Sequence, residues 1–200
     1  MVLPWVTNSI GIYRVEDPES EGTRPVGGPA AAEIIGELNH VFRQACVYFV
    51  LATNADVNIE YDRGSGYRWK NGILDETEKE AITPTLANNA LWSVHGRIFL
   101  FRRYWKHDMT GLTPQGNPWS MVFTHGLDGE LDPADVLHTV AHEMGHQLNL
   151  STRNSGGTDH DEDLPPEGTV RLMHPTDKGR WMRHEDWKEA NRTAKGRSGQ

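Results

Sequence analysis

Apolar and polar residues alternate along the first half of the chain in patterns that predict both helices and strands. From residue 29 to 42, apolar side chains recur at steps of three and four, which is typical of a helix with one buried face. The continuous apolar run at residues 45–51 predicts a strand buried on both faces, and residues 10–15 predict an earlier strand. A charged stretch at residues 75–82 predicts a short surface helix.

Two further strands are predicted near the middle of the chain. Residues 97–104 indicate a strand with a buried centre, and residues 119–125 alternate large apolar side chains with small or branched ones. The second pattern predicts a strand with one covered face at the edge of the sheet, where an extended peptide could pair with open backbone groups. An ordinary covered sheet edge is the alternative. The residues expected to bind substrate there are Ser120, Met121, Val122 and Phe123.

The most clearly marked element is a helix at residues 132–150. Asp132 is a preferred N-cap residue, Pro133 suits the first helical position, and Asp135 places negative charge at the positive end of the helix dipole. Apolar side chains recur along this helix at three- and four-residue steps and predict one buried stripe. His142 and His146 are four positions apart, so they share a different face.

His142, Glu143 and His146 form an H-E-x-x-H pattern on this helix. One turn separates the two histidines, so both rings can reach the same ion, whereas Glu143 projects about 100° away and stands beside the ion as a base. Zinc accepts imidazole ligands and keeps a position open for water when three protein ligands bind it. We therefore expect one catalytic zinc ion and a third ligand from elsewhere in the chain.

The loop that follows the helix is the expected source of the third ligand. His160 is the first choice, because an imidazole would complete a three-nitrogen site. Asp159 and Asp161 are the alternatives, either as ligands or as partners of the other imidazole nitrogen. A solvated acidic loop, with the third ligand elsewhere, also fits this composition.

Composition narrows the range of partners. A chain of 200 residues is long enough for one domain with a sizeable core, and Cys46 is its only cysteine, so no intrachain disulfide can form. The formal net charge of −8 argues against nucleic acid as the main partner. No apolar run approaches the roughly 20 residues that span a bilayer, and the first residues do not resemble a signal peptide. We expect a monomer that does not bind a membrane.

Residues 62–66 resemble a loose, oxygen-rich calcium loop, but a structural calcium ion is the less favoured reading of that segment. The polar residues 193–200 predict a disordered tail after a single catalytic domain at residues 1–192. Within that domain, residues 1–150 are expected to form an N-terminal lobe and residues 151–192 a smaller C-terminal lobe.

The H-E-x-x-H helix, a later His160 and the sequence Leu172-Met173-His174-Pro175 together resemble the metzincin clan of zinc metallopeptidases. Those enzymes place a methionine turn beneath the zinc ion, and Met173 and Pro175 match that turn. The order of elements is similar over roughly residues 30–192. The chain departs from the clan's extended pattern at Asn149, where the clan has glycine, and at Thr152, where it has histidine. Asparagine tolerates the left-handed conformation that the first position requires.

The resemblance implies an α+β fold: an N-terminal lobe with a mixed twisted sheet, helices and an edge strand, then the active-site helix, then a small irregular C-terminal lobe ending in a helix. It also implies that residues after Pro175, such as Thr176 and Asp177, line the pocket for the substrate side chain just past the cut bond. Because many related enzymes are exported, it gives a weak indication of export.

The expected function is that of a zinc-dependent endopeptidase acting on peptide or protein substrates, with Glu143 as the general base for a zinc-activated water. Two alternatives stay open at this point. One is a catalytically inactive zinc-binding module, which the lack of a compact third histidine favours. The other is a zinc hydrolase of non-peptide substrates.

Overall fold

The structure is a computed structural model that describes most of the chain. The described residues are 3–17, 24–57, 73–88, 94–105, 109–114, 117–150, 172–173, 180, 182 and 184–199. Within them the fold is α+β, with four α-helices and a mixed sheet, which confirms the expected fold class at this level. No described helix has the length and hydropathy needed to cross a membrane.

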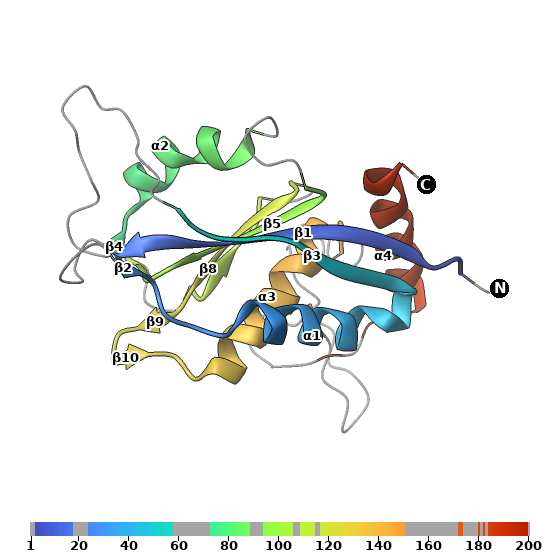
Figure 1. Cartoon of the computed structure of the whole chain (residues 1–200), viewed down its shortest axis with the longest axis horizontal. Helices are drawn as coiled ribbons and strands as arrows, with labels where there is room; N and C mark the ends of the chain where they lie inside the picture. Colours follow the sequence, from blue (N-terminus) through green and yellow to red (C-terminus); the bar gives the residue numbers. More distant parts are fainter. Residues whose placement is uncertain are drawn as a thin grey trace, which may run out of the picture.

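A twisted sheet forms the centre of the molecule (Figure 1). Four of its strands are parallel, in the order β3-β1-β5-β8, and two short strands pair antiparallel at β1 and β8. Two small two-stranded sheets lie apart from it, one of β9 and β10 and one of β4 and β6. The strands are β1 (Val6–Asp17), β2 (Arg24–Pro25), β3 (Val47–Val57), β4 (Ile73–Leu74), β5 (Gly96–Phe101), β6 (Arg103–Tyr104), β7 (Gly111–Leu112), β8 (Trp119–Phe123), β9 (His125–Gly126) and β10 (Gly129–Glu130).

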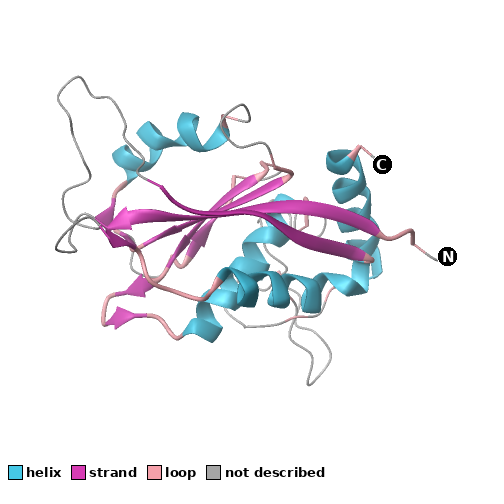
Figure 2. Ribbon diagram, in the orientation of Figure 1, coloured by secondary structure: helices cyan, strands magenta, loops and turns pink. Residues whose placement is uncertain are grey.

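Helices cover both faces of this sheet (Figure 2). Alternate side chains of β5 point to opposite faces, so that Ile98 packs with α1, α3 and α4, whereas Phe99 packs with α2 on the other side. The helices are α1 (Ala31–Phe42), the short 3-10 helix η1 (Arg43–Ala45), α2 (Glu76–Ala87), α3 (Pro133–Gln147) and α4 (His184–Ser198). The helices expected from the sequence at residues 29–42, 75–82 and 132–150 are confirmed, and α2 runs five residues further than expected, from 82 to 87.

The apolar run expected to form a strand buried on both faces corresponds to the start of β3, and the expected burial is wrong. β3 lies at the edge of the sheet and pairs with β1 alone among the described strands. Val47 and Phe49 are buried, whereas Tyr48 is 48% exposed and Val50 is 39% exposed, so only one face at the start of the strand is covered. On its outer edge, the Asn39 side chain of α1 accepts the amide hydrogen of Phe49 and donates to its carbonyl oxygen. The composition of the run predicted a strand correctly, but strand order decided how many of its faces are covered.

β8 was expected to be an edge strand, and that expectation is wrong. All five of its residues are buried, and β7 pairs with its outer side through Gly111 opposite Val122 and Leu112 opposite Met121. The Phe123 amide also donates to Thr110. The backbone that was expected to receive a substrate strand at Ser120, Met121, Val122 and Phe123 is therefore largely occupied by the protein's own chain.

The polar C-terminal segment also differs from the expectation. Residues 193–198, expected to begin a disordered tail, form the last turns of α4. Ala190 and Ala194 are fully buried, and the Ala194 carbonyl accepts a hydrogen bond from the side chain of Asn8 on β1. Asn191 donates to the carbonyls of Pro4 and Ala45. Small apolar residues spaced one turn apart were enough to hold this helix against the sheet, although its average composition is polar.

Candidate metal and catalytic site

The start of α3 follows the capping rules read from its sequence. The Asp132 carboxylate accepts the amide hydrogen of Ala134 at 2.8 Å, and Pro133 occupies the first turn. The helix ends at Gln147, and Asn149 adopts the left-handed conformation with φ of 62°. The expectation that asparagine would turn the chain at this position is confirmed.

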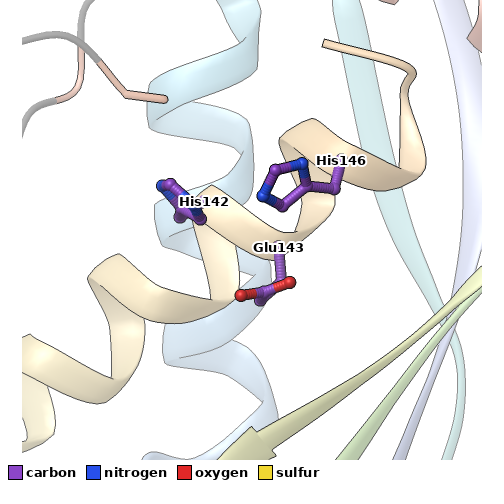
Figure 3. A group of neighbouring side chains, drawn as sticks. All are labelled: His142, Glu143 and His146. Carbon is purple, nitrogen blue, oxygen red and sulfur yellow. The ribbon is translucent and has the colours of Figure 1, made fainter. Parts of the chain in front are cut away.

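His142 and His146 project from the same side of α3 toward one another (Figure 3). Their ring centroids lie 4.9 Å apart, with the ring planes at 78°. One potential ligand atom from each histidine and one from Glu143 all lie within 4.8 Å of one another. The expected convergence of the two imidazoles is therefore present in the folded chain, and this group of three could hold a metal ion.

The orientation of the His142 ring is set by the chain segment at residues 172–173. The Nδ1 atom of His142 lies 2.8 Å from the backbone carbonyl oxygen of Leu172. Because a carbonyl oxygen only accepts hydrogen bonds, Nδ1 carries the proton and donates it, which leaves the lone pair on Nε2. This is the second contact that metal-binding histidines usually make, and it prepares Nε2 as the ligand atom.

Met173 lies directly against α3 at Gly145. Leu172 and Met173 form a turn and are both buried. A Cβ atom placed on Gly145 would overlap Met173 Sδ, so only glycine lets the methionine approach the helix this closely. Met173 therefore packs closely against the histidine-bearing helix, whereas Pro175, the other residue expected in a methionine turn, lies outside the described residues.

Glu143 points to a different side of the helix from the two imidazoles, as Figure 3 shows. Its side chain is buried, and burial raises the pKa of its carboxyl group to about 8, with a hydrogen bond from Thr113 acting in the opposite direction. Its Oε2 atom has no hydrogen-bond partner within the described part of the chain. A buried carboxyl oxygen without a partner is costly, and such atoms concentrate where a protein binds water, an ion or a substrate.

β7 contributes to the site in a way that sequence reasoning missed. Gly111 lies against the Glu143 carboxyl group with no side chain between them. A Cβ added to Gly111 would come within 2.6 Å of Glu143 Cγ and would overlap Oε1. Two residues on, the Thr113 hydroxyl lies 3.3 Å from the Glu143 carbonyl oxygen. The only sequence indication was the glycine itself, which can mark a close backbone approach but does not say to what.

A chain of buried hydrogen bonds connects β7 to the end of α3. Thr113 Oγ1 lies 2.6 Å from Ser120 Oγ, and Ser120 Oγ accepts a hydrogen bond from Gln147 Nε2 at 2.7 Å. Gln147 also donates to the carbonyl of Arg97 on β5. Ser120, expected to face a substrate, thus holds the strand and the helix together from inside the protein.

The donor chemistry fits zinc, because two imidazoles converge beside an oxygen donor and one imidazole is already oriented by a backbone carbonyl. The expected third ligand His160 and its alternatives Asp159 and Asp161 lie outside the described residues, as do Pro175, Thr176, Asp177 and the possible calcium segment at residues 62–66.

No protein-family model matches the chain, and no curated protein matches it. Among solved structures, the chain is similar to one described as "Structure of a chaperone-substrate complex", with 15% sequence identity and a TM-score of 0.47. The match covers 76% of this chain and 25% of the other chain, so this protein spans only a quarter of that one's length. A likeness of this extent assigns neither a family nor a function.

Proposed function

We propose that this protein is a zinc-dependent endopeptidase of metzincin type. The observation that carries the proposal is the convergence of the His142 and His146 rings, 4.9 Å apart, beside a buried carboxyl group whose Oε2 lacks a partner within the described residues. The close contact between Gly145 and Met173 and the Leu172 carbonyl at His142 support the metzincin type, because a methionine turn beneath the histidines is a mark of that clan.

His142 and His146 would hold the ion, with His160 as the preferred third ligand and Asp161 or Asp159 as alternatives. When bound, zinc lowers the pKa of a coordinated water and polarises a substrate carbonyl. Glu143 then acts as the general base: its Oε2 accepts the proton of the attacking water and passes it to the leaving amine.

The test compares the wild-type protein with Glu143→Gln, which keeps the shape of the side chain but cannot accept a proton. Purified protein is assayed for bound zinc by elemental analysis and for cleavage of an unfolded casein. We expect about one zinc ion per chain in both proteins and a fall in turnover of at least about 100-fold in the variant, because general base catalysis contributes about that much. Glu185→Gln, at an exposed position on α4, is the matched control and should cleave like the wild type.

Full activity in Glu143→Gln would show that the base has been wrongly assigned. Stable zinc binding without cleavage of any peptide in a mixed library would favour the inactive zinc-binding module, and zinc-dependent hydrolysis confined to non-peptide esters would favour the other alternative. Zinc analysis of His160→Ala and Asp161→Ala identifies the third ligand, because loss of the true ligand lowers zinc occupancy.

A further inference from the structure

We propose that Thr113 is a positioning residue for Glu143, and that β7 holds the carboxyl group in the orientation that leaves Oε2 available. This inference rests on the proposed function, because it concerns the base of that reaction. It goes beyond the H-E-x-x-H pattern, since it assigns a role to a strand that lies 30 residues before Glu143 in the chain.

The first support is the pair of contacts that enclose the carboxyl group. Gly111 lies against it so closely that an added Cβ would come within 2.8 Å of Glu143 Cδ. The Thr113 hydroxyl lies 3.3 Å from the backbone carbonyl oxygen of Glu143, and its interaction with the Glu143 side chain lowers the pKa of that carboxyl group. One contact restricts the carboxyl group by shape and the other by a directed hydrogen bond. Together they limit the rotamers that Glu143 can adopt.

The second support is that Thr113 is itself held in place. Its hydroxyl lies 2.6 Å from Ser120 Oγ, which is fully buried and accepts a hydrogen bond from Gln147 Nε2. Through Ser120 and Gln147, Thr113 is therefore tied to the end of the helix that carries Glu143.

The third support is that β7, which contains Gly111 and directly precedes Thr113, is held firmly in the sheet. β7 pairs with the buried strand β8, and the Phe123 amide of β8 donates to the backbone carbonyl of Thr110. The base on the helix and its holder on the strand are therefore parts of one packed unit. A misplacement of about 1 Å in a reacting group can cost about 100-fold in rate, so this placement bears on turnover.

The experiment measures kcat and KM of zinc-loaded full-length protein on a fluorogenic peptide that the wild type cleaves. Thr113→Val keeps the shape of the side chain and removes the hydroxyl. We expect kcat to fall roughly 10- to 100-fold with little change in KM or zinc content, and Thr113→Ser to recover most of the loss because it restores the hydroxyl. Thr110→Val is the matched control: it removes a hydroxyl bond to Thr139 of α3 rather than to Glu143, and should leave kcat unchanged.

A second variant tests the same idea should Thr113→Val fail to fold. Gly111→Ala places a Cβ against the buried side chain of Glu143, within 2.6 Å of its Cγ, so the carboxyl group must shift. We expect kcat to fall and the melting temperature to drop by a few degrees while the protein stays folded. Wild-type kcat in both Gly111→Ala and Thr113→Val would overturn the inference, as would an equal loss in Thr110→Val. A wild-type protein without zinc-dependent cleavage would instead overturn the proposed function.

Discussion

Asn149 ends the zinc-site helix in a conformation that few residues accept, and this makes a sharp prediction about stability. Its φ is 62°, and its side-chain amide donates to Glu189 Oε1 of α4 at 2.7 Å. Asn149→Ala loses this hydrogen bond, which is worth about 1.5 kcal/mol. The charge on the acceptor strengthens the bond, but Arg192 also bonds the same oxygen, so the value lies at the low end for a charged acceptor. The substitution also places Ala in the left-handed region, which costs about 1–2 kcal/mol. The expected loss is therefore about 3 kcal/mol.

Asn149→Gly separates these two causes. Glycine adopts the left-handed conformation at no steric cost, so this variant loses the hydrogen bond and about 0.5 kcal/mol for the greater freedom of the unfolded chain, about 2 kcal/mol together. Since about 1 kcal/mol shifts the melting temperature of a domain of this size by about 2–4 °C, the glycine variant should melt about 2–4 °C above the alanine variant.

The measurement is thermal unfolding followed by circular dichroism, with a chelator present so that metal binding does not contribute to stability. Asn54→Ala, at an exposed asparagine of β3 whose side chain accepts a hydrogen bond from Arg14, should change the unfolding free energy by less than about 0.5 kcal/mol. Equal melting temperatures for the glycine and alanine variants would refute the argument from the left-handed conformation. A glycine variant as stable as the wild type would refute the argument from Glu189.

Two further predictions concern α3. Gly145→Ala should destabilise the protein by about 1–2 kcal/mol, because the new methyl group overlaps Met173 Sδ. In the Met173→Ala background the same change should stabilise the protein by up to about 1 kcal/mol, because only the better helix propensity of alanine remains. Urea unfolding of the wild type, the two single variants and the double variant checks this, and an effect of the same sign in both backgrounds would contradict it. Asp132→Ala removes the N-cap and should cost about 1 kcal/mol in the same measurement, whereas Asp128→Ala, in an exposed turn, should cost less than half as much.

The sequence alone determined the helix that bears the site and the direction of its side chains. Asp132, Pro133 and the spacing of the two histidines are local features, and local geometry obliges residues four apart on a helix to share a face. For the same reason the left-handed turn at Asn149 could be foreseen. The spacing also placed Glu143 beside the histidine pair, on another side of the helix, as the structure has it.

Only the tertiary structure decided what surrounds that helix. β8 has the composition of an edge strand but is buried, because β7, a strand of two residues with no clear pattern, pairs with its outer side. The run at β3 has the composition of a central strand but lies at the edge of the sheet. The contacts of Glu143 with Gly111 and Thr113, and of His142 with Leu172, join residues about 30 positions apart. Spacing along a helix is set by the backbone, whereas strand order and contacts across such distances depend on how the whole chain packs, and no local pattern records them.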